Sequence, residues 1–470
     1  MAETIKADLG IIGAGSGGLS VAAGTAMLGR KVVLIEKGEM GGDCLNTGCV
    51  PSKALIAAAA RAEEMRDAKK FGIAGVDPKI DFAAVMDHVH GVIKSIAPID
   101  SQERFEGLGV TVIREHASFT GPREVKAGDT LIKAKHFVIA TGSTPFVPPI
   151  PGLDSVPYFT NETLFENRIL PDHLIIIGGG PIGIEMAQAF RRLGAKVTVI
   201  EGDKILGRED PELADIVRAR LVKEGVELVE SGKAEKVEKT PSGVSVTVGA
   251  RTIEGSHLLV AVGRKPTVGG MNLEAAGVDY DAKGLKTDSR LRTTNKRVYA
   301  AGDVAGGRQF THVAGYHASV LVRNILFKVP SKNNEQLAPR VTYCDPELAQ
   351  VGLTEAQARE RHGDIKVARW PFSQNDRAEA ERDTQGLIKI ITDKKGRILG
   401  AGIVGRGAGD LLQPCTLAIS SKLKIRAFTD MIAPYPTRSE AAKRAAGAWY
   451  SETLFSDRTK FLVRLLSILD

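Results

Sequence analysis

The chain has 470 residues, too many for one ordinary hydrophobic core, so its length predicts about two to four domains. Apolar residues make up 43% and charged residues 25%, a balance typical of globular α/β proteins and unlike disordered, collagenous or coiled-coil chains. The net charge of +7 is spread along the chain without a basic block, so we expect no nucleic-acid partner.

The sequence contains no apolar run long enough to cross a bilayer. The N-terminus carries the acidic residues Glu3 and Asp8 and does not resemble a cleavable signal peptide, so we expect a cytoplasmic protein without a membrane partner. Four cysteines are too few for a secreted disulfide framework. A close pair of them is therefore expected to serve catalysis or metal binding.

A dinucleotide-binding pattern occurs twice, in the order strand, glycine-rich turn, helix, strand and acidic residue. In such a βαβ unit the glycines let backbone amides approach a pyrophosphate, and the carboxylate accepts a hydrogen bond from a ribose hydroxyl. One glycine turn would be weak evidence because chance matches are common, but two in register predict two bound dinucleotides. The landmarks are Gly13, Gly15, Gly18 and Glu36, and then, 165 residues later, Gly178, Gly180, Gly183 and Glu201.

Glu201 indicates which nucleotide the second copy binds. Its carboxylate can accept from the free 2′-hydroxyl of NAD but would repel the 2′-phosphate of NADP, so NAD(H) is expected and NADP(H) is the weaker alternative. Arg208 lies a few residues further on and keeps that alternative open. A Glu201 that merely caps an exposed strand is the other interpretation.

A close cysteine pair, Cys44 and Cys49, lies in the segment Gly-Gly-Asp-Cys-Leu-Asn-Thr-Gly-Cys-Val-Pro-Ser-Lys at 41–53. The alanine-rich residues 54–62 predict a helix whose start is near Cys49, where the helix dipole lowers the pKa of a thiol. Because the pair follows the first nucleotide unit, the simplest arrangement stacks its disulfide on the flavin of an FAD held there. The nicotinamide nucleotide would then occupy the second unit.

Other interpretations of the cysteines are weaker. A zinc site needs four ligands, and the sequence offers no second close pair of Cys or His, so no metal site is expected. An inert structural disulfide would be unusual in the cytosol. Cys344 and Cys415 are expected to be ordinary buried thiols.

With these motifs the sequence resembles the class I pyridine nucleotide-disulfide oxidoreductases, the family of dihydrolipoamide dehydrogenase, glutathione reductase and mercuric reductase. The resemblance covers nearly the whole chain. It implies a glutathione-reductase-like α/β fold with two Rossmann-like domains, for FAD and NAD, an α+β dimerisation domain, and a homodimer. The matching segments are residues 41–53, Ala140-Thr141-Gly142, Val262-Gly263-Arg264-Lys265-Pro266 and Ala301-Gly302-Asp303.

The resemblance also places domain boundaries. An FAD-binding domain with the redox-active disulfide is expected at 1–148 and an NAD-binding domain at 149–272. A central segment at 273–338 would complete the FAD domain, and 339–470 would form the dimerisation domain.

Residue roles follow from the same resemblance. Cys49 would contact the flavin and Cys44 would exchange with the substrate. Lys53 and Glu185 would pair beside the flavin, where a fixed cation stabilises negative charge on the reduced ring. Asp303 would bind the ribityl chain of FAD and Ala117 its adenosine end. Further cofactor contacts are expected at Gly42, Thr141, Gly142 and Gly263.

The sequence departs from the family at the expected substrate site. Dihydrolipoamide dehydrogenase and glutathione reductase carry His-Pro-Thr-x-x-Glu, in which the histidine is the base toward the dithiol and the glutamate orients it. Here the segment runs from Tyr435 to Glu440 as Tyr-Pro-Thr-Arg-Ser-Glu. Tyrosine, with an ordinary pKa near 10, is a poor base at neutral pH, and losing a base costs about 10²- to 10⁴-fold in rate. His312 is the nearest substitute, although a structural role is the simpler interpretation.

The sequence therefore favours an FAD-dependent, NAD(H)-linked disulfide oxidoreductase similar to dihydrolipoamide dehydrogenase, acting on a small dithiol, a disulfide or a lipoyl domain. A mercuric-reductase-like metal or quinone reductase is the alternative. The tyrosine supports it, whereas the missing C-terminal cysteine pair and N-terminal metal-binding domain oppose it. An alternative of another class is a catalytically silent flavoprotein that senses redox state or binds lipoyl domains.

The C-terminal residues 457–470 predict an amphipathic helix. Packing on the dimer is the plain explanation, because three basic residues against two acidic ones are too few for a polybasic membrane anchor. The residues expected on its apolar face are Phe461, Leu462, Leu465, Leu466 and Leu469.

Overall fold

The computed structural model describes residues 3–468, and the chain divides into two compact units. Each unit is assembled from segments far apart in the sequence. The first consists of Met1–Arg61, Lys79–Ile177 and Glu235–Glu335, and the second of Ala62–Pro78, Gly178–Ala234 and Gln336–Asp470.

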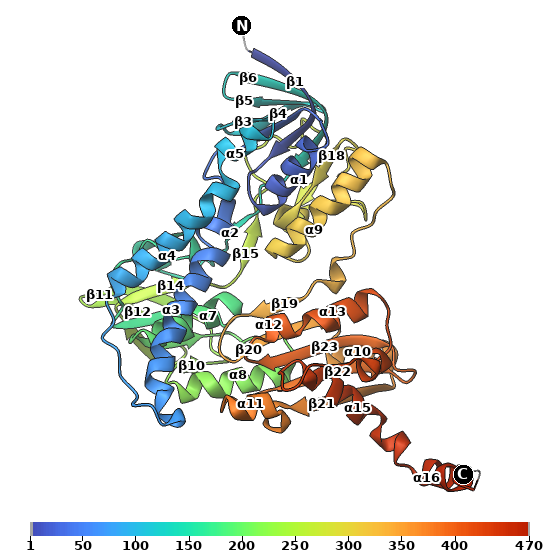
Figure 1. Cartoon of the computed structure of the whole chain (residues 1–470). Coiled ribbons are helices and arrows are strands. Elements are labelled where there is room, and N and C mark those ends of the chain that lie inside the picture. Colours follow the sequence, from blue (N-terminus) through green and yellow to red (C-terminus); the bar gives the residue numbers. More distant parts are fainter. Residues whose placement is uncertain (1–2, 469–470) are drawn as a thin grey trace. The chain divides into compact units, whose positions relative to one another are not determined.

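A mixed β-sheet forms the centre of the first unit (Figure 1). Its strands lie in the order β3-β2-β1-β6-β5-β4, and β18 also pairs with β6. The pairs β2–β3, β1–β2, β1–β6 and β6–β18 are parallel, so crossover connections join them and both faces are covered. The strands are β1 (Glu3–Ile12), β2 (Val32–Ile35), β3 (Val110–Ile113), β4 (Ala117–Gly121), β5 (Glu124–Ala127), β6 (Thr130–Ile139) and β18 (Val298–Ala300).

Helices α1 (Ser16–Ala26) and α9 (Thr311–Val322) pack beside this sheet and share one hydrophobic core with it (Figure 1). Leu9 and Ile11 of β1 belong to that core, whereas Ile12 belongs to a second core on the opposite face. Both faces of β1 are therefore apolar, as its run of apolar residues predicts. Because α1 starts directly after the first glycine turn, strand, turn and helix follow in the expected order.

The helix that carries the second cysteine begins in the first unit. This helix, α3, runs from Cys49 to Asp67, so it starts at the expected place and is longer than the alanine-rich run alone indicates. The parallel pair of β8 (His173–Ile177) and β14 (His257–Val260) leads to the second glycine turn. Further elements are α2 (Gly42–Asn46), α4 (Phe82–Ile96), β7 (Ser143–Pro145), β15 (Arg264–Pro266) and the antiparallel strands β11 (Lys236–Thr240), β12 (Gly243–Val248) and β13 (Arg251–Gly255).

The second unit begins its nucleotide-binding half with α7, which spans Pro181–Arg192. β9 (Lys196–Ile200) follows and pairs in parallel with β10 (Glu227–Val229), and α8 (Pro211–Lys223) connects them. Proline at the first helical position of α7 is favourable, because that residue needs no amide hydrogen for the helix. The helix and strand of the second glycine pattern are therefore confirmed in outline.

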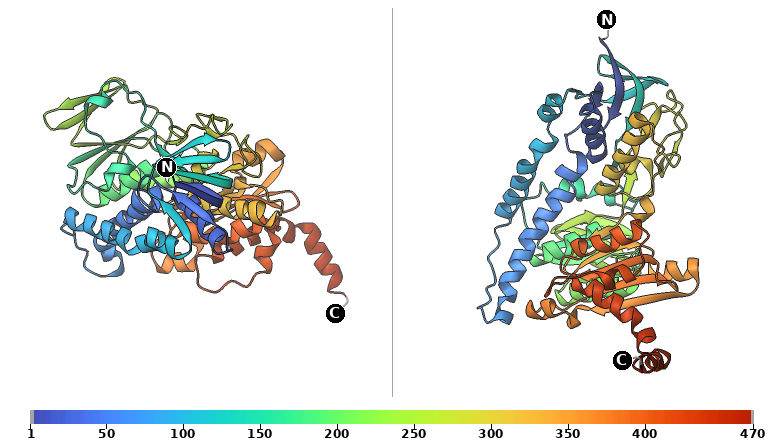
Figure 2. Two further views of the ribbon diagram at one scale, coloured as in Figure 1. Left: turned by 90° about the horizontal axis from the view of Figure 1, so that it is seen from above. Right: turned by 45° about the vertical axis from the view of Figure 1, so that its right-hand side comes forward.

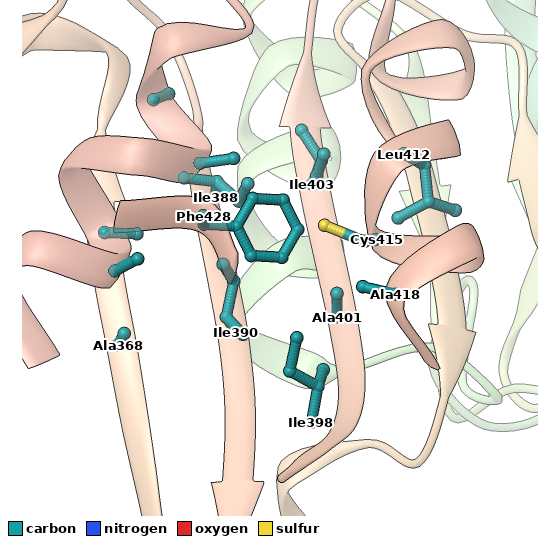
Figure 3. Close-up of a cluster of buried hydrophobic side chains, with 14 of the residues drawn as sticks. Ala368, Ile388, Ile390, Ile398, Ala401, Ile403, Leu412, Cys415, Ala418 and Phe428 are labelled. Carbon is teal, nitrogen blue, oxygen red and sulfur yellow. The ribbon is translucent and has the colours of Figure 1, made fainter. Parts of the chain in front are cut away.

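An antiparallel sheet forms the remainder of the second unit, in the order β19-β20-β23-β22-β21. Its buried face packs on short helices around one hydrophobic core (Figure 3). Cys415, from α13 (Gln413–Ser420), lies in this core, and burial raises its pKa to about 12. Cys415 is thus the ordinary buried thiol that we expected. The strands are β19 (Arg340–Thr342), β20 (Glu347–Gly352), β21 (Ile365–Pro371), β22 (Leu387–Asp393) and β23 (Ile398–Gly405).

Two helices end the chain. α15 (Glu440–Leu454) packs against β21 and β22, and α16 (Asp457–Leu466) extends beyond it at the end of the second unit (Figure 2). The expected apolar residues of α16 are exposed, and Leu469 lies outside the described residues. Among residues 3–468, no helix combines the length and the hydropathy that a membrane crossing requires.

A buried ammonium group ties the antiparallel sheet to the helices of the second unit. Lys389 of β22 is only 3% exposed, and its Nζ lies 2.9 Å from Asp210 Oδ2 and 2.8 Å from both Glu212 Oε2 and Glu355 Oε2. Arg369 also pairs with Glu212 and Glu355. Removing the lysine would leave the buried carboxylate of Asp210 without its cation.

We therefore expect Lys389→Met to destabilise the second unit by about 3–5 kcal/mol, since an uncompensated buried charge is costly. Both tryptophans of the chain, Trp370 and Trp449, lie in this unit, so tryptophan fluorescence during urea unfolding reports on it. The control is Arg359→Ala, which removes an exposed partner of Glu355 and should cost less than about 1 kcal/mol. Equal effects of the two variants would contradict a stabilising role for the buried cluster.

Candidate functional site

The first glycine turn is a tight approach of strand, helix and cofactor loop. Gly13 has a φ of +104°, and a β-carbon at Gly18 would collide with the carbonyl oxygen of Gly13. A β-carbon at Gly42 would lie 2.8 Å from Gly15 Cα, whereas Gly15 itself faces open space. The turn can therefore admit a pyrophosphate at the start of α1, and Gly42 is brought to it as expected.

Glu36 contacts this turn from the end of β2. Its Oε2 accepts a hydrogen bond from the Ala14 amide at 2.6 Å, and its Oε1 accepts from the Gly38 amide at 2.7 Å. A carboxylate fixed beside the glycine turn is where a ribose would lie in a dinucleotide-binding unit. The geometry fits the adenosine half of FAD.

The second glycine turn repeats this geometry within the second unit. Gly178 has a φ of +117°, Gly180 faces open space, and Gly183 is buried in α7. Glu201 Oε2 accepts from the Gly179 amide at 2.6 Å, just as Glu36 accepts from Ala14. Glu201 thus contacts the turn instead of merely capping an exposed strand, and its surroundings fit a second dinucleotide.

The two cysteines lie side by side at the junction of α2 and α3, and the structure describes both as free thiols. The Cys49 sulfur lies 3.3 Å from the hydroxyl of Thr311, the first residue of α9. The pKa of Cys49 is lowered to about 6, chiefly by a hydrogen bond from Cys44 and further by Thr311 and the charge of Lys53, although burial opposes this. The surroundings of Cys49 therefore favour its thiolate form more than those of an ordinary thiol do.

Cys44 behaves in the opposite way. Its pKa is raised far above the ordinary range, mainly because its thiol donates to Cys49 and also because it is partly buried. In the reduced pair these opposite shifts place the proton on Cys44 in preference to Cys49. The flavin contact of Cys49 and the substrate exchange of Cys44 stay predictions.

Thr311 was not singled out by the sequence, although it directly precedes His312. The His312 ring stacks on Phe310, with ring centroids 5.2 Å apart and planes at 11°. Thr311 is the first residue of α9, and its side chain is the one that reaches the cysteine pair. The available signal was the position at the helix start, where a side chain points back toward the preceding turn.

An arginine network connects the cysteine loop to Asp303. Arg264 of β15 donates to the Ser143 hydroxyl at 2.7 Å and to Asn161 Oδ1 at 3.1 Å, and it forms an ion pair with Asp43 at 3.3 Å. Ser143 in turn donates to Asp303 Oδ2 at 2.5 Å, and burial raises the pKa of Asp303. The sequence indicated Arg264 only as part of a segment that matches the family, whereas the structure shows that Arg264 contacts Ser143, Asn161 and Asp43.

The other expected FAD contacts lie on neighbouring loops of the first unit. Thr141 donates to the carbonyl of Thr267 at 2.7 Å, and Gly142, with a φ of +66°, accepts from the Thr267 amide at 3.0 Å. Gly263 faces open space with a φ of +141°. Ala117 is buried at the start of β4.

A buried histidine fixes the turn that carries Asp303. His317 is fully buried in α9, and its Nδ1 accepts a hydrogen bond from the Gly302 amide at 3.2 Å. Its proton therefore resides on Nε2, which lies 3.2 Å from Glu335 Oε2. No sequence pattern marks this residue, because its partners become neighbours only in the fold.

Tyr435 and Glu440 do not bond to each other. Tyr435 is 67% exposed. Its hydroxyl donates to Asp376 Oδ2 at 2.8 Å, and this hydrogen bond raises the pKa of Tyr435. Glu440, the first residue of α15, accepts from Arg444 Nε at 2.8 Å. Asp376 is thus a candidate site residue that the sequence did not indicate.

Lys53 and Glu185 are described within different units. Lys53 Nζ lies 3.3 Å from the Ser52 hydroxyl in α3. Glu185 is buried in α7 and accepts from the Tyr343 amide at 2.9 Å. Their pairing beside the flavin stays a prediction. Among the residues that the structure describes, no group of three or more His, Cys, Asp or Glu side chains could hold a metal ion.

Two family models match the chain, both from the pyridine nucleotide-disulphide oxidoreductases. The main model covers residues 7–318, and the dimerisation domain of the same family covers 338–446. The chain therefore belongs to the pyridine nucleotide-disulphide oxidoreductase family, whose members are oxidoreductases that use FAD and NAD(P)(H). The dimerisation domain supports a homodimer.

Similar proteins carry two different names. A mercuric reductase of Streptomyces lividans is 36% identical over 95% of this chain and 96% of its own length. A dihydrolipoyl dehydrogenase of Geobacillus stearothermophilus is also 36% identical, over 94% of this chain and 96% of its own length. The identity of this chain to both is the same, so sequence similarity does not choose between them.

Solved structures agree on the fold. The HOCl-induced flavoprotein disulfide reductase RclA from Escherichia coli has a TM-score of 0.85 at 29% identity, covering 94% of this chain and 99% of its own. LpdA from Mycobacterium tuberculosis has a TM-score of 0.87 at 26% identity, covering 95% and 99%. The glutathione-reductase-like α/β fold is confirmed.

Thr311 offers a test of the thiolate. In the reduced protein, alkylation of Cys49 by iodoacetamide should rise with pH with a midpoint of about 6, because only the thiolate reacts. Thr311→Val should move this midpoint upward by about one pH unit, since a hydrogen bond to the charged sulfur is lost. Thr311→Ser keeps the hydroxyl and should retain the original midpoint. An unchanged midpoint in Thr311→Val would contradict the assigned contact.

Proposed function

We propose that the chain is an FAD-dependent, NAD(H)-linked disulfide oxidoreductase in which two electrons pass through the Cys44–Cys49 pair between NAD(H) and a dithiol or disulfide substrate. The observation that carries this proposal is the position of the pair. Gly42, two residues before Cys44, meets the first glycine turn at Gly15, and the Cys49 sulfur at the start of α3 lies 3.3 Å from the Thr311 hydroxyl. The lowered pKa of Cys49 and the raised pKa of Cys44 agree with a redox pair, since the thiolate is the reactive form.

Residues of the first unit fit FAD. The first glycine turn and Glu36 would hold the adenosine and pyrophosphate, and Asp303 would bind the ribityl chain. When bound, FAD supplies the two-electron link between the nicotinamide and the thiols. The second turn with Glu201 would hold NAD(H), because the carboxylate disfavours a 2′-phosphate.

The chemistry of the pair can be written for a disulfide substrate. The Cys44 sulfur attacks one substrate sulfur while its proton passes to Cys49, so that a mixed disulfide forms and one substrate thiolate departs. That thiolate takes the proton back from Cys49. The Cys49 thiolate then attacks the Cys44 sulfur, which releases the second substrate thiolate and leaves a Cys44–Cys49 disulfide.

Tyr435 would limit the reverse reaction. Oxidation of a dithiol requires a base near the substrate, and the hydrogen bond to Asp376 raises the pKa of Tyr435 above that of an already weak base. We therefore propose that dihydrolipoamide is a poor substrate for this chain. Small disulfides are the proposed substrate class, and a lipoyl domain is the weaker alternative.

A metal-ion reductase is the second candidate function. Tyr435, at the position where the family of dithiol enzymes has histidine, favours it, as does the similarity to proteins named mercuric reductase. A silent flavoprotein is disfavoured because Cys44, Cys49, Lys53 and Glu185 are all present. A chain without turnover has no chemical need of all four.

The role of Cys44 can be tested directly. Cys44→Ser should abolish NADH-dependent reduction of disulfides and of Hg(II), while transfer from the flavin to artificial dyes is retained. The matched control is Cys344→Ser, because the Cys344 thiol is buried and donates to the Pro346 carbonyl at 3.2 Å, a bond that serine can keep. Loss of dye reduction in Cys44→Ser to the same extent would contradict the assigned electron path.

The missing base can be restored. Tyr435→His should raise the oxidation of dihydrolipoamide with NAD by up to about 10²-fold, because an imidazole accepts a proton at neutral pH. Tyr435→Phe is the control and should bring no increase. Steady-state rates of NADH formation decide the outcome. No increase in Tyr435→His would mean that the substrate pocket differs from the dithiol enzymes in more than this residue.

A further inference from the structure

Several hydrogen bonds join the turn that carries Tyr435 to the short helix α11 (Asp376–Ala380) and the residues next to it. Asn375 caps this helix by accepting from the Ala378 amide at 3.0 Å, and its Nδ2 donates to the Thr437 carbonyl at 3.0 Å. One asparagine thus sets both the start of α11 and the position of the Tyr-Pro-Thr turn.

Arg438 joins the same turn to the residues that follow α11. It is 9% exposed, its Nε donates to Glu381 Oε2 at 2.8 Å, and its Nη2 donates to the Asp383 carbonyl at 3.0 Å. Its guanidinium also lies over the ring of Phe372, 5.7 Å from the centroid. Because these contacts follow α11 directly, Arg438 holds the turn in register with the helix.

These contacts place the side chains of Tyr435 and Asp376 opposite each other. The Tyr435 hydroxyl donates its single proton to Asp376 Oδ2 at 2.8 Å. Glu440, which the motif would make the acidic partner, accepts instead from Arg444 at 2.8 Å and 2.7 Å on its own helix. The acidic group at this position therefore comes from α11.

We propose that Asp376, rather than Glu440, is the positioning residue for Tyr435, and that their hydrogen bond restricts the enzyme to acceptors whose reduction needs no proton from residue 435. This inference rests on the proposed disulfide oxidoreductase function. With its proton held by Asp376, Tyr435 can neither take a proton from a dithiol nor give one to the second departing alkyl thiolate, which Cys49 has no proton left to supply. Disulfides whose thiolates are weak bases do not need that proton.

Two disulfide probes distinguish these cases. Lipoamide releases an alkyl thiolate, which is a strong base, whereas the aromatic disulfide dithiobis-nitrobenzoate releases a weakly basic thiolate. The readout is the ratio of NADH-dependent turnover with lipoamide to turnover with the aromatic disulfide, measured in the full-length holoenzyme. A general loss of stability lowers both rates and leaves the ratio unchanged.

Asp376→Ala should free the phenolic proton and raise this ratio by about tenfold. The increase should vanish when Tyr435→Phe is present as well, because the released proton is then missing. Glu379→Gln removes a neighbouring exposed carboxylate of α11 and should leave the ratio unchanged. The pKa of Tyr435 can be measured in parallel by ultraviolet titration, as the difference between a protein and the same protein with Tyr435→Phe added. This pKa should be lower in Asp376→Ala than in the unaltered protein, because the Asp376 carboxylate raises it.

The outcomes separate the two proposals. If neither probe is reduced in a Cys44-dependent way, the proposed function fails. If both are reduced through Cys44 but Asp376→Ala leaves the ratio unchanged, the function stands and the role of Asp376 is overturned. A change of the ratio in Glu440→Gln but not in Asp376→Ala would make Glu440 the positioning residue.

Discussion

The contact between Cys44 and Cys49 is the interaction on which the proposed chemistry depends. Burial raises the pKa of both sulfurs, whereas the hydrogen bond between them lowers the pKa of Cys49 and raises that of Cys44. This requires three chain segments to meet, namely α2 with Cys44, the start of α3 and the start of α9. Each of those segments is held by its own contacts.

The surrounding network keeps those segments in place. Arg264 links the segment beside the cysteines to Asp303 through Ser143. His317 accepts a hydrogen bond from the backbone amide of Gly302, the residue before Asp303. None of these residues carries out chemistry. They are buried or partly buried polar groups with satisfied hydrogen bonds, which rigidify a site because any displacement leaves a donor or acceptor unpaired.

In the second unit, the hydrogen bonds of Tyr435 and Glu440 differ from those that the family motif implies. The turn with Tyr435 is fastened to α11, so the acidic partner of residue 435 is supplied by a helix and not by the motif itself. The Tyr435 hydroxyl is thus bound to Asp376, at the position where the motif of the dithiol enzymes has histidine.

The sequence by itself determined the family, both nucleotide-binding patterns, the cysteine pair and the unusual tyrosine, because these features are local in the chain and have fixed spacing. It also predicted the helix that begins at Cys49 and the burial of Cys415. Only the tertiary structure revealed Thr311, His317 and Asp376 as contacts of the site. Their partners are 15 to 262 residues away, and a hydrogen bond between such residues exists only after the chain has folded.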